Sequence, residues 1–295
     1  MIKIHPYIKA FLKIALSVAA LWYVFTKIDF KEVVNIFNHV NYGWLFAALL
    51  LFIISKIFSS LRLNVFFKNI GSGLTENSNL RLYLLGMYYN LFLPGGIGGD
   101  GYKIYLLNRK YGTKAQKLFW AVLLDRVNGV LALFVLAMVM VPFIPVPEIY
   151  KYLALAAIPV SAAAYYVMIY WFFKDFAKGL NLTNSYSLMV QVAQLGSAWF
   201  ILYANHHQEH ILPYLFLFLI SSIVATLPIT IGGIGSREIT FLFGAEIMHL
   251  DIHQSIALSL LFYVITAVVS LFGIYFSLNE KALKLKPLKN EVLTS

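Results

Sequence analysis

The chain has 295 residues, of which 60% are hydrophobic and only 12% are charged, and its mean hydropathy is +0.76. Soluble domains carry about 25% charged residues, so this composition excludes a soluble globular domain and predicts an integral membrane protein. The net charge of +10 fits basic loops beside anionic lipid headgroups, and we expect no nucleic-acid partner.

Three membrane spans are predicted in the first half, at about residues 8–25, 44–67 and 118–141, each close to 20 mainly apolar residues. Lysines before the first span place the N-terminus in the cytoplasm, and residues 28–40 predict a short interfacial helix on the far side. The second span carries polar residues on one helical face, which should look into the protein: Ser55, Lys56, Ser59, Ser60 and Arg62.

A broken segment precedes the third span. Its sequence, Asn90-Leu-Phe-Leu-Pro-Gly-Gly-Ile-Gly-Gly-Asp-Gly-Tyr-Lys103, places a proline and a run of glycines inside hydrophobic sequence. The flanking apolar arms, at about 80–93 and 99–107, are each too short to span, so they predict a re-entrant helical hairpin. Non-helical backbone at membrane depth is tolerated only where protein or water satisfies its polar groups. The break is therefore a candidate functional site.

The second half repeats this order. Spans are predicted at about 152–173, 185–203 and 255–278, with a second broken hairpin whose arms lie at about 211–227 and 236–248. Loop charges place this hairpin on the outside and the C-terminal lysines in the cytoplasm. The span at 185–203 has its own polar face, made by Asn184, Ser187, Gln191 and Gln194.

The predicted fold is an all-α polytopic membrane protein, a single membrane domain of residues 1–295 with two inverted repeats, 1–145 and 146–295. Each repeat has three membrane-spanning helices and a broken re-entrant hairpin, and the odd number of crossings inverts the second. Similar breaks, Gly95-Gly-Ile-Gly-Gly-Asp and Gly232-Gly-Ile-Gly-Ser-Arg, support the repeat, and such paired interruptions indicate a transport site. Eight full crossings are the alternative, if the longer arms span the membrane with tilt.

The chemistry expected at the breaks is anion binding. A helix that begins there presents backbone N–H groups and the positive end of its dipole, and glycine lets a phosphate approach closely. The alternative is that the prolines only kink helices that pack through glycine contacts. Arg237 is the best phosphate ligand because a guanidinium binds phosphate through two N–H groups, and Lys103 is a weaker one.

Charged residues inside the membrane are functional candidates by default, and Asp125 and Arg126 lie within the third span. Asp100 and Glu238 are either partners for cations or helix-start acids that offset the dipole. We expect Arg126 to pair with Asp100 or Glu238, and Asp125 to pair with Lys56, Lys103 or Arg237. The candidate substrate-binding residues are Asn90, Pro94, Gly95, Gly96, Gly98, Gly99, Asp100, Lys103, Asp125, Arg126, Pro228, Gly232, Gly233, Gly235, Arg237 and Glu238; no metal site, cofactor or catalytic residue is expected.

Three motifs in order resemble a known family. They are the Asn90–Lys103 segment, Leu124-Asp-Arg-Val-Asn-Gly129, and Pro228 with Ile231-Gly-Gly-Ile-Gly-Ser-Arg-Glu238. Together they resemble the lysylphosphatidylglycerol synthase transmembrane family, the flippase-like membrane domain at the N-terminus of the bacterial multiple peptide resistance factor, which also occurs alone. The resemblance covers about residues 8–280 and implies movement of a phospholipid between leaflets. No segment resembles the soluble transferase domain, so we expect no enzyme activity.

The leading functional hypothesis is a membrane lipid transporter, or flippase, in the cell (inner) membrane with both termini cytoplasmic. It would move a phospholipid or other anionic lipid through a site at the two breaks. The alternatives are an ion-coupled carrier of a small soluble anion and a non-transporting accessory subunit of a lipid-modifying system. A homo-oligomer and a lipid-modifying enzyme partner are both compatible with the sequence.

Overall fold

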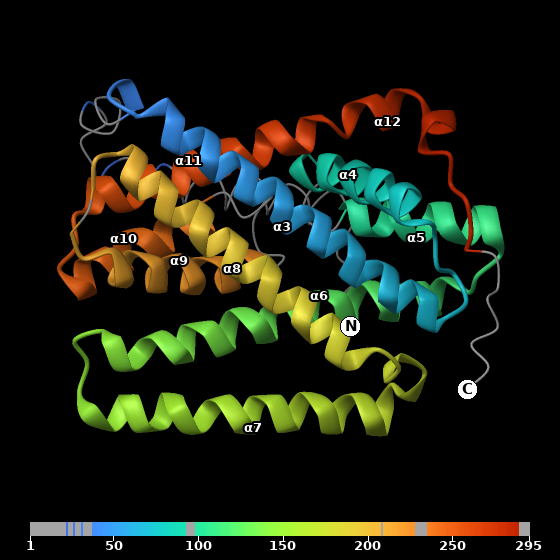
Figure 1. Ribbon diagram of the computed structural model, residues 1–295, viewed down its shortest axis with the longest axis horizontal. Coiled ribbons are helices and arrows are strands. Elements are labelled where there is room, and N and C mark those ends of the chain that lie inside the picture. Colours follow the sequence, from blue (N-terminus) through green and yellow to red (C-terminus); the bar gives the residue numbers. More distant parts are fainter. Residues whose placement is uncertain are drawn as a thin grey trace, which may run out of the picture.

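The computed structural model describes residues 22, 26, 31, 37–92, 98–207, 209–227 and 235–288, and this part of the chain is almost wholly helical (Figure 1). The span predicted at 8–25 and most of the interfacial helix predicted at 28–40 lie outside it. So do six candidate site residues, namely Pro94, Gly95, Gly96, Pro228, Gly232 and Gly233.

Within the described residues, five helices are long and apolar enough to cross a membrane. They are α3 (Tyr42–Asn69), α6 (Ala115–Met140) continued by η1 (Val141–Phe143), α7 (Glu148–Phe172), α8 (Leu180–Ala204), and α11 (Ile252–Leu271) continued by α12 (Ile274–Leu278). These helices confirm the predicted spans from the second to the sixth. The chain is a multi-pass membrane protein.

Four shorter helices form two packed pairs. In the first, α4 (Glu76–Phe92) packs against α5 (Gly98–Tyr111), and in the second, α9 (Ile211–Thr226) packs against α10 (Ser236–Met248). At 13 to 17 residues, each is shorter than the roughly 20 residues that a span needs. The predicted arms are confirmed as helices, although α5 continues through Arg109 and Lys110, whose charges favour the negative end of its dipole.

The centre of the molecule is an antiparallel pair of helices, α3 and α8, which run diagonally across Figure 1. Trp44 near the start of α3 stacks on Phe200 near the end of α8, with ring centroids 5.3 Å apart. Further along, Phe58 meets Tyr186 at 6.1 Å. One buried hydrophobic cluster surrounds the α9–α10 pair and another surrounds the α4–α5 pair, and α3 contributes to both.

The long helix after each short pair packs against the other pair. Helix α6, which follows α5, packs against α9, and α11, which follows α10, packs against α4. Gly273, between α11 and α12, lets α11 pack closely against α4. A Cβ at this position would lie 2.3 Å from the carbonyl oxygen of Leu84 on α4. The two halves of the chain therefore interlock around the regions where the short helices begin and end.

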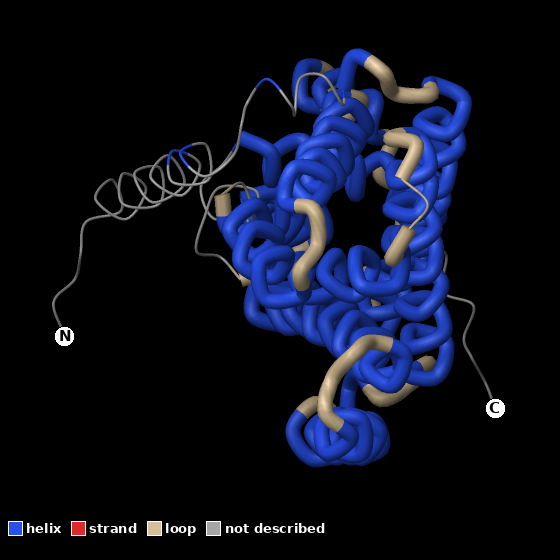
Figure 2. Tube along the Cα trace, turned by 90° about the vertical axis from the view of Figure 1, so that its left-hand side faces the viewer, coloured by secondary structure: helices blue, strands red, loops and turns tan. Residues whose placement is uncertain are grey.

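Helix α7 lies at the periphery. It packs mainly against α6, and both views show it set apart at the lower edge of the molecule (Figures 1 and 2). Only Ala154, Tyr165 and Ile169 are buried among its 25 residues. Most of this apolar helix is therefore left uncovered by the described part of the chain.

Candidate functional site

A cavity of about 290 Å³ lies between the central helices and the short pairs. We call it the charged cavity, because five cations and two carboxylates line it: Lys56, Arg62, Lys103, Arg126, Arg237, Asp100 and Asp125. Its other polar lining includes Ser59, Tyr83, Asn90, Gln191, Gln194, Ser222 and Thr226. Of the predicted site residues, the structure brings Asn90, Asp100, Lys103, Asp125, Arg126 and Arg237 together here.

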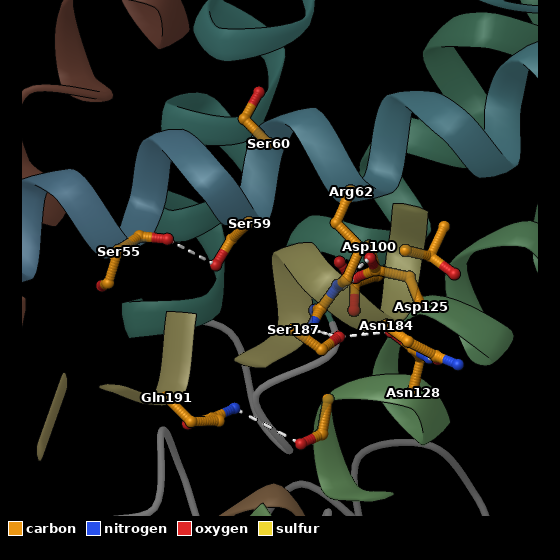
Figure 3. Close-up of polar contacts among 12 residues, drawn as sticks. Ser55, Ser59, Ser60, Arg62, Asp100, Asp125, Asn128, Asn184, Ser187 and Gln191 are labelled. Atoms are coloured by element: carbon orange, nitrogen blue, oxygen red, sulfur yellow. Dashed lines mark hydrogen bonds and ion pairs between the residues drawn. The ribbon is translucent and has the colours of Figure 1, made fainter. Parts of the chain in front are cut away.

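The polar faces of the two central helices point into the protein, as predicted (Figure 3). Ser59 and Arg62, three residues apart on α3, both line the charged cavity and are both buried. On α8, Ser187 and Gln191 are buried at the matching spacing of about one turn. Residues that would be costly against lipid are thereby placed where protein groups meet them.

Asp125 on α6 is bound by Arg62 of α3 in a two-pronged ion pair. Its Oδ1 accepts from Nε at 2.7 Å and its Oδ2 from Nη2 at 3.2 Å, while Nη1 donates to Ser187 on α8 at 2.8 Å. Gly129 leaves room for the guanidinium, since a Cβ there would lie 3.0 Å from Nη1. The predicted partners of Asp125, which were Lys56, Lys103 and Arg237, were wrong. The packing of α3 against α6 places Arg62 beside Asp125 instead.

An amide network continues from this ion pair. Ser187 donates to the side-chain oxygen of Asn128 on α6, and the Asn128 amide nitrogen donates to Asn184 on α8 at 2.5 Å and to the Tyr165 hydroxyl on α7 at 3.1 Å. Figure 3 shows Asn128, Asn184 and Ser187 gathered beside Arg62. The network joins α6, α7 and α8 beside Arg62, which lines the charged cavity.

Asp100, near the start of α5, forms ion pairs with two cations. It accepts from Lys103 Nζ at 2.9 Å and from Arg126 Nε at 2.5 Å. The pairing of Arg126 with Asp100 is one of the two that we predicted for this arginine, and it is confirmed. Asp100 and Lys103 are both buried, and Lys103 Nζ also lies 4.7 Å from the centroid of the Tyr83 ring. This network lines the side of the cavity that is formed by α4 and α5.

One backbone amide at the start of α5 is bound by a side chain of α4. Asn90 at the end of α4 accepts a hydrogen bond from the Gly99 amide at 2.8 Å. Gly99 also faces the α4 backbone, where an added Cβ would lie only 1.9 Å from the Gly86 carbonyl oxygen. Gly98 is the first residue of α5, and neither Gly98 nor Gly99 lines the charged cavity. Gly99 therefore serves close packing of α4 against α5, which is the alternative raised for the breaks.

The start of α10 is closed by Glu238. Its Oε2 accepts from the Gly235 amide at 2.6 Å and its Oε1 from Ser259 of α11 at 2.8 Å. Gly235 has φ +85°, a conformation that favours glycine. Glu238 is buried, does not line the charged cavity, and has the geometry of a helix-start acid rather than a partner for Arg126.

Two of the five cations have no carboxylate partner among the described residues. Arg237 lies against two aromatic rings, with its guanidinium carbon 5.0 Å from the Phe262 centroid and 5.6 Å from that of Phe218, and its Nη2 donates to Ser222 at 3.4 Å. Lys56 lies 4.4 Å over the Phe52 ring. The other three cations each pair with Asp100 or Asp125.

Several lining residues were not among the predicted site residues. Lys56 and Arg62 belong to the polar face of α3. The spacing that predicted this face to look into the protein could also have identified both as site residues. Tyr83 and Ser222 lie on the short helices α4 and α9, in sequence whose apolar composition gives no sign of a site.

Residues 10–273 match a family described as the lysylphosphatidylglycerol synthase TM region. The chain belongs to this family. The match spans both breaks and every residue that lines the charged cavity, and it confirms the family predicted from the three motifs. The family indicates a membrane lipid-related function. A search of curated proteins found no match.

Proposed function

We propose that this protein is a lipid transporter that moves an anionic phospholipid headgroup between leaflets through the charged cavity. One observation carries the proposal. A single cavity among membrane-capable helices gathers five cations against two carboxylates, and Lys56 and Arg237 have no carboxylate partner in the described part of the chain. The family supports a lipid as the substrate class.

The charge balance favours a phosphate in this cavity. A cation near the centre of a membrane helix costs roughly 2.5–3.5 kcal/mol on insertion scales, so an unbalanced one needs compensation from a partner or ligand. A guanidinium binds phosphate through two parallel N–H groups, while a lysine ammonium binds it as a point charge. Arg237 would therefore orient the phosphate, and Lys56 would add attraction from α3.

The helix arrangement supports transport through two inverted repeats with re-entrant hairpins. The contacts of the two halves correspond: α6 packs against α9 as α11 packs against α4, and α3 pairs with α8. Paired short helices in repeats that meet at mid-membrane are typical of transport sites. In this proposal the two hairpins open to opposite sides of the cell membrane, both termini are cytoplasmic, and the site is exposed to each side in turn.

We propose transport rather than catalysis for the same residues. Asp100 and Asp125 each accept charge-assisted hydrogen bonds from a guanidinium group, so both carboxylates are already engaged within the protein. Their partners hold them in place across helices α3, α5 and α6. These carboxylates therefore fit a role in shaping the cavity better than one in acid–base chemistry.

The direct test is lipid movement in reconstituted liposomes. Purified protein is inserted into vesicles that contain fluorescent phosphatidylglycerol, and the loss of inner-leaflet protection from a membrane-impermeant quencher is followed. We expect the wild-type protein to move lipid faster than empty liposomes do, and Arg237→Ala to lose this activity. Arg109 is an exposed arginine at the end of α5, and Arg109→Ala should keep the wild-type rate. Movement at the empty-liposome rate would contradict the proposal. Uptake of glycerol phosphate without lipid movement would favour the soluble-anion carrier, and neither activity would favour the accessory subunit.

A further inference from the structure

A second space lies beside the charged cavity, on the neighbouring face of α6. This groove, of about 390 Å³, is formed where α6 and α9 meet the peripheral helix α7. We call it the apolar groove; it is lined by Val127, Val130, Leu131 and Phe134 of α6, Ser161, Ala164, Tyr165 and Met168 of α7, and Ile223 of α9.

The two hydroxyl groups in this lining are already bound within the protein. Ser161 Oγ donates to the Ile158 carbonyl oxygen at 2.9 Å, and the Tyr165 hydroxyl accepts from Asn128 at 3.1 Å. The groove therefore offers a ligand aliphatic and aromatic contacts. Nothing in its lining carries a charge, in contrast to the neighbouring cavity.

The apolar groove and the charged cavity adjoin. Val130 lines both, and Arg126, one turn earlier on α6 and about 6 Å along its axis, lies in the cavity. On α9, Ile223 lines the groove while the preceding residue, Ser222, lines the cavity. A molecule with a charged end and an apolar end could therefore place one in each space.

We propose that the apolar groove holds an acyl chain of the lipid whose headgroup occupies the charged cavity. The inference rests on the proposed function and narrows its substrate to an anionic lipid with acyl chains, because a soluble anion has no use for the groove. A chain in hydrocarbon gains little hydrophobic energy on entering the groove, since lipid tails are equally apolar. Occupancy must therefore depend on the headgroup that the cavity binds.

Photocrosslinking tests this dependence. Protein in liposomes is irradiated with phosphatidylglycerol or diacylglycerol that carries the same diazirine-labelled acyl chain, and labelled residues are mapped by mass spectrometry. The reference surface is the outer face of α7 at Val160 and Val167, which are exposed. We expect groove labelling at Val130 and Met168, relative to that face, to be at least threefold higher with phosphatidylglycerol. An equal ratio for the two lipids would overturn the inference. Labelling of the outer face of α7 with none in the groove would also overturn it, and would mean that a second copy or another protein covers the groove.

A matched pair of variants separates this inference from the proposed function. Ala164→Trp fills the apolar groove, whereas Ala163→Trp adds the same bulk at an exposed neighbour outside it. We expect Ala164→Trp to abolish the headgroup-dependent labelling and to slow lipid movement at least fivefold, with Ala163→Trp within twofold of wild type. If wild type moves lipid and the two variants behave alike in both assays, the groove inference fails alone. If wild type moves no lipid but the headgroup-dependent labelling persists and Ala164→Trp removes it, the transporter proposal fails and the groove inference stands.

Discussion

The two broken hairpins have similar sequences but place opposite charges at their equivalent positions. When the glycine runs are aligned, Asp100 of the first hairpin corresponds to Arg237 of the second. Asp100 is paired with both Lys103 and Arg126, so the charges nearest the first break are bound to one another. Arg237 has no carboxylate partner among the described residues, because Glu238 beside it is engaged in closing the start of its own helix.

This difference separates two tasks within one motif. Residues around the first break bind one another and hold α5 against α6, whereas Arg237 at the second break has no carboxylate partner in the described part of the chain. A repeated pattern in the sequence therefore does not imply two equal halves of a binding site. If the comparison is correct, substitutions at the first break should mainly change stability, and substitutions at the second should mainly change transport.

The largest expected effect is on stability, at Asp100. Asp100→Asn removes the carboxylate between two cations and leaves them uncompensated in the protein interior, which should cost about 3–5 kcal/mol of unfolding free energy. Thermal or denaturant unfolding in detergent micelles measures it. The matched control is Asp175→Asn, in an exposed ion pair with Lys117, where the loss should stay below about 1 kcal/mol. Equal losses in the two variants would mean that Asp100 does not hold the first break together.

The next effect is on transport, at Arg237. Arg237→Ala removes two-pronged binding of a phosphate, and a hydrogen bond to a charged group contributes about 1.5–3 kcal/mol, so lipid movement should fall roughly 10- to 150-fold. Arg237→Lys keeps the charge but loses the planar geometry and should retain an intermediate rate. The unfolding midpoint of Arg237→Lys should stay near wild type. If Arg237→Ala moved lipid at the wild-type rate, the second hairpin would not contribute to headgroup binding.

Much of the fold follows from the sequence. Hydropathy locates the spans, and the helical period shows that residues such as Ser59 and Gln191 face inward. The short arms around each break are also visible, because their apolar runs are interrupted by proline and glycine. The cost of placing a charged or strongly polar group in hydrocarbon explains why these patterns are reliable: such a face must turn toward protein or water wherever it lies in the membrane.

The partners of the inward-facing groups do not follow from the sequence. Periodicity predicts that Arg62 and Asp125 leave lipid, but it does not indicate which helix each one meets, since this depends on how α3, α6 and α8 pack. Asn90 is a similar case, because its bond to Gly99 depends on the packing of α4 against α5. The peripheral position of α7 was also hidden, as its composition matches that of the other spans.

A pair of glycines in α5 tests whether the first hairpin is held by close packing. Gly99→Ala forces a Cβ against the Gly86 backbone at 1.9 Å and should cost about 1–3 kcal/mol. Gly101→Ala meets nothing within 4 Å and should be neutral or stabilise α5 by up to about 1 kcal/mol. Unfolding in detergent compares the two variants directly. A Gly99→Ala protein as stable as Gly101→Ala would show that α4 and α5 do not approach each other this closely.

The smallest effect is expected at Lys56, which approaches the cavity from α3 rather than from a hairpin. Lys56→Gln keeps the length of the polar side chain but removes a point charge, so lipid movement should fall about two- to fivefold, the equivalent of roughly 0.5–1 kcal/mol. The exposed Lys114→Gln is the matched control. The double variant with Arg237→Ala decides whether both cations bind one phosphate: groups that share a ligand are not additive, so its loss should be smaller than the product of the single losses. If the losses multiply, Lys56 acts independently of Arg237, and the phosphate is bound by the second hairpin without help from the central helices.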